Sequence, residues 1–186
     1  DQLYDEHVFL FSAHSVQYLF ALEGLELIDV KPQITHGGSM RYVLAHQGAY
    51  QRQPAVEELL QQEQTNGLHL LETFKSFAIR IAESKQELLD LLEELKLGGK
   101  RVAGYGATSK STTILNYCGI GPGLIEYICD TTPIKHGKFT PGMHIPVVPY
   151  EHFQQSYPDY VVLFAWNHQQ EIMDKETAFA KTGGRW

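Results

Sequence analysis

The chain has 186 residues, with 15 Lys or Arg, 22 Asp or Glu and nine His, so its formal charge is −7 when the His are neutral. This length fits one domain, or one domain and part of another, and 43% hydrophobic residues fit a globular protein rather than a disordered or fibrous one. The acidic balance argues against nucleic-acid binding, and no apolar stretch approaches the roughly 18 residues of a membrane span. The two Cys lack zinc-site spacing. We therefore expect a cytoplasmic protein that binds neither nucleic acid nor a membrane.

The two ends of the chain suggest a segment of a longer protein. The chain begins at Asp1 without Met and without a signal-peptide pattern. It ends at Gly183–Trp186 directly after a helical pattern, where an α/β domain would continue into its next strand. We therefore expect further structure beyond both ends.

The first 50 residues have the pattern of the closing strands of an α/β sheet. Val8–Phe11 is an apolar run that predicts a buried strand. Ser12 is a suitable cap for a helix over residues 13–23. Strands are predicted at residues 25–30 and 40–46.

Residues 51–83 predict a helical connection. Pro54 begins a short amphipathic helix, and a longer helical pattern runs from residue 68 to residue 97. Ser84-Lys85-Gln86-Glu87 has the capping-box form, which predicts a break between two helices near Ser84. The Leu and Phe residues of this pattern are interpreted as packing positions.

Residues 84–186 alternate between short strands and helices. Strands are predicted at 102–105, 124–129, 144–148 and 160–166, and helices at 109–118 and 167–181. This alternation predicts an α/β fold with a mostly parallel, Rossmann-like sheet.

A glycine-containing loop between a predicted strand and helix is a candidate phosphate site. It reads Gly104-Tyr105-Gly106-Ala107-Thr108-Ser109-Lys110. Glycines allow close backbone approach, a helix start favours an anion, and Ser109 and Lys110 add a hydroxyl and a positive charge. Ser109 stands where the dinucleotide fingerprint has its third glycine, and Asp130 follows the next strand, where a carboxylate commonly binds a ribose. The alternative is a tight turn closed by a helix cap.

A second candidate group lies just before the first apolar run, in Tyr4-Asp5-Glu6-His7. His is a natural general base near neutral pH, and Tyr and Glu can donate or orient. In an extended segment Tyr4 and Glu6 share a face, whereas a helical turn brings Tyr4 and His7 together. The alternative is a solvated loop.

Two further polar positions are weaker candidates. His36 lies in the glycine turn His36–Ser39, which also suits a plain hairpin connection. Asn167 follows a strand at the sheet edge where ligands bind, but is equally suited to cap the next helix. The remaining His residues have no ligand spacing, so no metal site is predicted.

Several motifs together resemble one family. They are Tyr4–Ser12, His36–Arg41, Gly104–Thr113, Leu115–Gly121 and Phe164–Asn167, in the same order along nearly the whole chain. The sequence resembles the S-adenosylmethionine-dependent sugar C-methyltransferases that act on nucleotide-linked 4-keto deoxysugars.

The resemblance implies a division of the chain and of the chemistry. Residues 1–50 would be the C-terminal end of the methyltransferase domain, 51–83 the helical connection and 84–186 the Rossmann-like C-terminal domain. The family's N-terminal zinc-binding region and most of its methyl-donor site have no counterpart here, so the chain alone should bind S-adenosylmethionine poorly and be inactive.

The resemblance also implies roles for the candidate residues. His7 would remove the proton from sugar carbon C3, while Tyr4 and Glu6 would hydrogen-bond the sugar or the catalytic groups. The loop Gly106–Lys110 would hold the phosphates and Asp130 the ribose, with Asn167 and His36 as further substrate contacts.

Two other interpretations stay open from the sequence. One is an NAD(P)-dependent oxidoreductase or epimerase fragment that uses residues 102–130 as its dinucleotide site. The other is a non-catalytic nucleotide-binding module.

Overall fold

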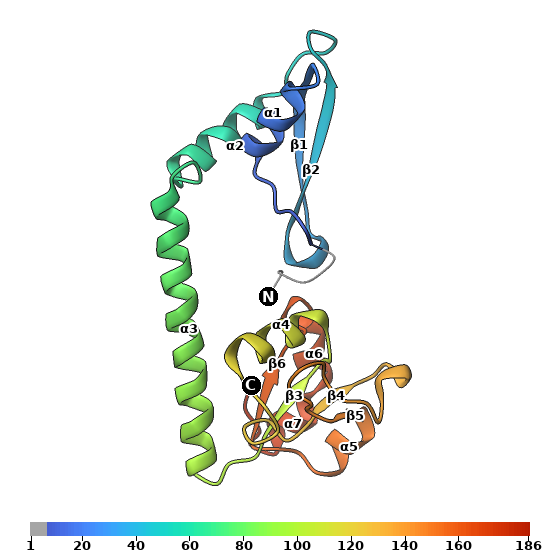
Figure 1. Cartoon of the computed structure of the whole chain (residues 1–186). Coiled ribbons are helices and arrows are strands. Elements are labelled where there is room, and N and C mark those ends of the chain that lie inside the picture. The colour runs from blue at the N-terminus through green and yellow to red at the C-terminus, as the bar shows by residue number, and fades with distance from the viewer. Residues whose placement is uncertain (1–6) are drawn as a thin grey trace. The chain divides into compact units, whose positions relative to one another are not determined.

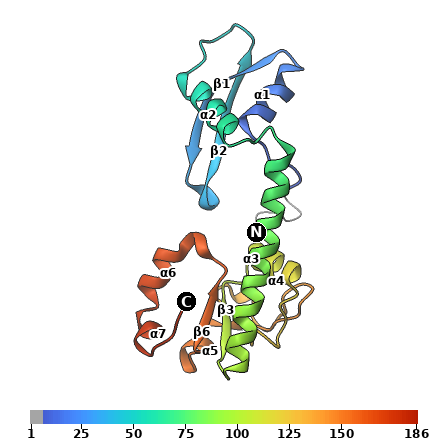
Figure 2. The same cartoon turned by 90° about the vertical axis from the view of Figure 1, so that its left-hand side faces the viewer.

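A computed structural model describes residues 7–186, apart from the side chain of His36 (Figures 1 and 2). The chain divides into two compact units, one spanning Phe9–Ile81 and the other containing Ala82–Trp186. The long helix α3 (Leu71–Leu97) contributes residues to both. Across the described range, no helix combines the length and apolar character that crossing a membrane requires.

The first unit is a β-hairpin with two helices beside it (Figure 1). Its elements are α1 (Ala13–Ala21), β1 (Leu25–Gln33), η1 (Thr35–Gly37), β2 (Ser39–His46) and α2 (Pro54–Thr65). Ser12 caps α1 by accepting from the Ser15 N–H, as the sequence predicted. The antiparallel strands and both helices bury a small core of Ala13, Val16, Leu27, Val30, Val56 and Leu60.

The prediction of a buried strand at Val8–Phe11 is wrong for this chain. The four side chains are 75%, 74%, 66% and 51% exposed, and the segment has no strand conformation. Within the described residues β1 and β2 pair only with each other, so this apolar run has no strand to pair with.

Helix α3 is continuous from Leu71 to Leu97, so the predicted break at Ser84 is also wrong. The capping-box residues lie inside a long run of good helix formers, where the backbone hydrogen bonds of the helix continue unbroken. Leu92 is buried in the core of the second unit, which confirms the packing interpretation for the C-terminal half. Phe74 and Phe77 of the N-terminal half are 52% and 53% exposed.

The second unit is built on a four-stranded parallel sheet in the order β5–β4–β3–β6. The strands are β3 (Val102–Tyr105), β4 (Ile128–Asp130), β5 (Val147–Pro149) and β6 (Tyr160–Leu163). The predicted α/β, Rossmann-like fold is therefore confirmed, although β4, β5 and β6 are shorter than their predicted runs.

Helices cover both faces of this sheet. The C-terminal half of α3 and α4 (Ser109–Cys118) pack on one face, around Leu92, Leu115 and Phe164. Helices α5 (Tyr150–Gln155), α6 (Gln169–Lys175) and α7 (Thr177–Lys181) cover the other, around Phe153 and Phe179. Figure 2 shows α6 and α7 on one side of β3 and β6 and α4 on the other.

The single helix predicted over 167–181 is interrupted. It consists of η3 (Trp166–His168), α6 and α7, with a break at Glu176. The Glu176 side chain is 1% exposed, and its carboxylate accepts from the hydroxyls of Tyr105 and Tyr150, each at 2.9 Å. We attribute the break to this buried contact, which fixes the backbone where helical periodicity alone would continue.

Candidate functional site

The candidate site lies where the chain leaves the carboxyl ends of β3, β4 and β6. Strand β3 is central: the chain runs from it to β4 and β5 on one side of the sheet, and then crosses from β5 to β6 on the other side of β3. Open α/β sheets bind ligands in the crevice at such a switch point. The loop after β3 holds Gly106–Thr108, and the segment after β6 holds Trp166 and Asn167.

Two glycines allow these strands and loops to approach closely. A Cβ on Gly104 would lie 2.8 Å from Ile128 Cγ1 and 2.9 Å from Phe164 Cε2. Gly106 has φ +90°, and a Cβ there would lie 3.0 Å from Ala165 Cβ. Only glycine therefore fits both positions without displacing the neighbouring strands.

The start of α4 is capped, yet keeps two backbone donors. Thr108 Oγ1 accepts from the Ser111 N–H at 3.1 Å, and Ser111 Oγ accepts from the Thr108 N–H at 3.0 Å. The N–H groups of Ser109 and Lys110, in the first turn, have no partner within the helix. The cap is therefore compatible with an anion site, because it uses other N–H groups than those that a phosphate would contact.

Lys110 is the most informative residue of the site. Its side chain is 8% exposed, and its Nζ donates to Asn167 Oδ1 at 3.1 Å and lies 4.7 Å from the Trp166 ring centroid. Within the described residues no carboxylate lies within 4.0 Å of this ammonium. A buried charge is costly without a counter-ion, so the arrangement favours an anionic ligand.

Asp130 ties the loop after β3 to the end of β4. Its Oδ2 accepts from the Ala107 N–H at 2.8 Å and from Lys135 Nζ at 3.0 Å, and its Oδ1 accepts from the Thr132 N–H at 2.8 Å. Burial raises the pKa of Asp130, but the hydrogen bonds from Thr132 and Lys135 outweigh it, so the net pKa is lowered.

A cleft of about 420 Å³ opens above these strand ends; we call it the switch-point cleft. Gly106, Asp130, Lys135, Ala165, His168 and Lys175 are among the residues that line it. Lys175 stacks on the Tyr150 ring with its Nζ 4.0 Å from the centroid, and that Nζ lies 3.8 Å from Glu176.

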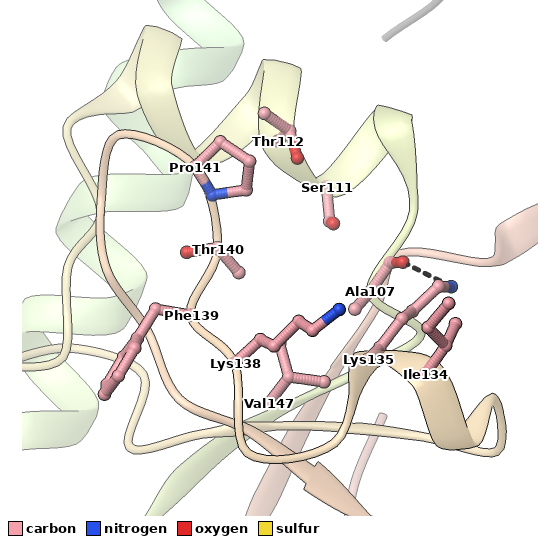
Figure 3. A pocket seen from close by; sticks show the side chains of 10 residues that line it. All are labelled: Ala107, Ser111, Thr112, Ile134, Lys135, Lys138, Phe139, Thr140, Pro141 and Val147. Atoms are coloured by element: carbon pink, nitrogen blue, oxygen red, sulfur yellow. Dashed lines mark hydrogen bonds between the residues drawn. The ribbon is translucent and has the colours of Figure 1, made fainter.

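A smaller cavity of about 260 Å³ lies on the other side of Lys135, between α4 and residues 134–147 (Figure 3). Figure 3 shows Lys135 donating to the Ala107 carbonyl, at 2.8 Å. Lys135 and Ala107 border this cavity, which we call the side pocket.

The structure brings together some predicted residues and leaves others apart. Lys110 and Asn167, predicted separately, are in contact. His7 is half-buried, whereas Tyr4 and Glu6 lie outside the described residues. The backbone of His36 lies in η1, and its side chain is outside the description.

Sequence reasoning missed Lys135, although its position five residues after Asp130 placed it within reach. It also missed the buried Glu176, because a Glu in an amphipathic helical pattern is expected to be exposed. In residues 7–186 no group of three or more His, Cys, Asp or Glu is arranged to hold a metal ion.

Comparison with known proteins identifies the family. Residues 34–186 match the family described as the C-methyltransferase C-terminal domain. The chain belongs to this family. It is also 37% identical over 187 residues to the C-methyltransferase NovU of Streptomyces niveus, with 100% of this chain and 44% of that protein aligned.

The chain thus spans less than half the length of this C-methyltransferase relative. Membership of the family favours the methyltransferase interpretation over the oxidoreductase and the non-catalytic module. The Rossmann-like unit, Ala82–Trp186, lies wholly within the matched residues, so the buried ammonium of Lys110 is part of a C-methyltransferase C-terminal domain.

Proposed function

We propose that the full-length protein transfers a methyl group from S-adenosylmethionine to carbon C3 of a nucleotide-linked 4-keto deoxysugar. The observation that carries this proposal is the identity to a C-methyltransferase over the whole chain. The motif resemblance supports the sugar acceptor, and the anion-binding character of the Lys110 site supports a phosphate-bearing substrate.

The reaction requires an acidic carbon and a base. A C–H next to a ketone loses its proton when the resulting enolate is stabilised by hydrogen-bond donors. We assign proton removal from C3 to His7, and hydrogen bonds to the sugar or the catalytic groups to Tyr4 and Glu6. Bound S-adenosylmethionine supplies an electrophilic methyl group.

The loop at the start of α4 is proposed to hold the substrate's phosphates. The N–H groups of Ser109 and Lys110 in the first turn of α4, together with the Lys110 ammonium, would donate to the phosphate oxygens. Asn167 orients the ammonium by accepting from it at 3.1 Å. We assign the ribose to Asp130, whose carboxylate would accept from a ribose hydroxyl.

The described residues do not fit the methyl donor. The donor carries a positively charged sulfonium, whereas the Lys110 ammonium beside the loop has no carboxylate within 4.0 Å among the described residues. Like charges in a partly buried site repel. We therefore propose that the donor binds mainly in a part of the protein outside this chain. The family resemblance implies that the zinc-binding region also lies outside it.

Mass spectrometry of the full-length protein with the methyl donor and a 4-keto nucleotide sugar tests this proposal. We expect the sugar to gain one methyl group bonded to carbon. The matched 4-hydroxy sugar should gain none, because its C3–H is not acidic. Methylation of an oxygen or nitrogen, or equal methylation of both sugars, would contradict the proposal.

A further inference from the structure

One apolar stripe runs along helix α3 from its first turns to its last. It consists of six residues at helical spacing: Phe74, Phe77, Ile81, Leu88, Leu92 and Leu95. At about 3.6 residues per turn, positions three, four and seven apart share one face of a helix. Because α3 is unbroken (Figure 1), the stripe stays on one side of the helix throughout.

The two halves of this stripe differ in burial. Leu92 is 1% exposed, and Leu88 and Leu95 pack against the same core of the second unit. Phe74 and Phe77 are both about half exposed. The face beside them is polar, with a Lys75–Glu72 ion pair of 2.7 Å outside the stripe. The amphipathic pattern therefore continues where the cover ends.

The unit that carries the exposed half lacks packing partners in other places as well. Its sheet has two strands, and within the described residues these pair only with each other. The side chains of Phe9–Phe11 in the same unit are each more than half exposed. A two-stranded hairpin is marginally stable alone, and most of the stability of a surface helix comes from packing of its apolar face. The exposed half of the stripe is therefore a face that a further partner covers.

The comparisons indicate which partner this is. The matched family is a C-terminal domain, and more than half of the C-methyltransferase relative lies outside the match. A partner in the same polypeptide is present at an effective concentration that reaches the millimolar range. Such a partner outcompetes a second copy of the protein at ordinary working concentrations.

We propose that Phe74, Phe77 and Ile81 form the docking face for the N-terminal part of the full-length protein. This inference rests on the proposed function, since it takes the chain as the C-terminal portion of a longer C-methyltransferase whose N-terminal part binds the donor. Helix α3 is then a support that both parts share. Its C-terminal half is packed in the unit that holds Lys110, and its N-terminal half packs against the donor-binding part.

A shared helix has a consequence for the reaction. The reacting atoms of methyl transfer must come within about 3–3.5 Å of each other. A continuous helix of 27 residues is roughly 40 Å long. Packing both parts on one side of it would keep the donor and the substrate in a fixed arrangement.

Two measurements on the full-length protein test the docking face, with Ile79 as the matched control. Ile79 is 59% exposed and lies on α3 outside the stripe. In hydroxyl-radical footprinting of the unmodified protein, Phe74 and Phe77 should be oxidised several-fold more slowly than Ile79, after correction for intrinsic reactivity. The photo-cross-linker p-benzoylphenylalanine at position 77 should cross-link, within one molecule, to a peptide N-terminal to residue 1. The same cross-linker at position 79 should give little product.

The other outcomes contradict the inference. Cross-links between two molecules would assign the face to a second copy, and cross-links to residues 1–186 would mean that this chain covers its own stripe. Equal oxidation of Phe77 and Ile79, or no cross-link from position 77, would leave the face uncovered. Methylation of the sugar at C3 together with any of these results overturns this inference alone. The intramolecular cross-link without C3 methylation overturns the proposed sugar substrate and leaves the docking face standing.

Discussion

Replacing Lys110 with Met removes a buried charge while keeping most of the side-chain stem. Lys110 is 8% exposed, and among residues 7–186 its ammonium contacts the Asn167 amide oxygen at 3.1 Å and the Trp166 ring. A charged hydrogen bond contributes about 1.5–3 kcal/mol, so loss of this donor to a phosphate should raise the Kd of pyrophosphate about 10- to 150-fold.

Stability should respond differently from binding in the same variant. Lys110→Met loses a charged hydrogen bond to Asn167, which contributes about 1.5–3 kcal/mol, but it also removes the desolvation cost of a charge without a counter-ion, which offsets most of that loss. We expect the free energy of unfolding to change by less than about 1 kcal/mol.

The assay is calorimetry with pyrophosphate at constant ionic strength, because exposed charges are screened by salt. Lys181→Met, on an exposed position of α7, is the matched control and should bind as the wild type does. A Kd for Lys110→Met within twofold of wild type, in a folded protein, would refute the assignment of this ammonium to an anion.

Three further changes test the structure around the site. The pKa of Asp130 is lowered in the folded state, so its carboxylate contributes stability above about pH 4 that is lost as pH falls through the folded pKa. Asp130→Asn should therefore be less stable than wild type at pH 7. Urea unfolding should show the difference in unfolding free energy between the two proteins shrinking at lower pH. Glu176→Leu leaves the hydroxyls of Tyr105 and Tyr150 buried without their acceptor and should lower the free energy of unfolding by about 2–4 kcal/mol, with partial recovery on adding Tyr105→Phe; no loss would contradict the buried cluster. Ser84→Pro should cost about 3 kcal/mol in a continuous α3, whereas thermal melts unchanged from wild type would support a break there.

Local patterns in the sequence are enough to predict where the candidate site lies. Gly104 and Gly106 predict a turn with close backbone approach, and Lys110 follows at the start of a predicted helix. The order of strands and helices then places Asn167 at the same sheet edge, and the structure shows the two side chains in contact.

Other features depend on contacts between distant residues and have no local signal. The helical pattern is interrupted at Glu176, because its carboxylate is hydrogen-bonded by tyrosines from β3 and α5. The periodicity of the sequence gives no sign of these two contacts. The capping-box pattern at Ser84 is a true local signal that the surrounding helix overrides. Val8–Phe11 has the composition of a buried strand, but burial also needs a partner strand.

Solvent exchange at sugar carbon C3 tests the central claim most directly, because it isolates proton removal from methyl transfer. The full-length protein is incubated in D₂O with the 4-keto nucleotide sugar and no methyl donor, and NMR follows the C3 proton. The wild type should exchange this proton well above the buffer rate, and His7→Asn should lose that exchange while keeping its pyrophosphate affinity. Exchange by His7→Asn at the wild-type rate would contradict the assignment of His7 as the base.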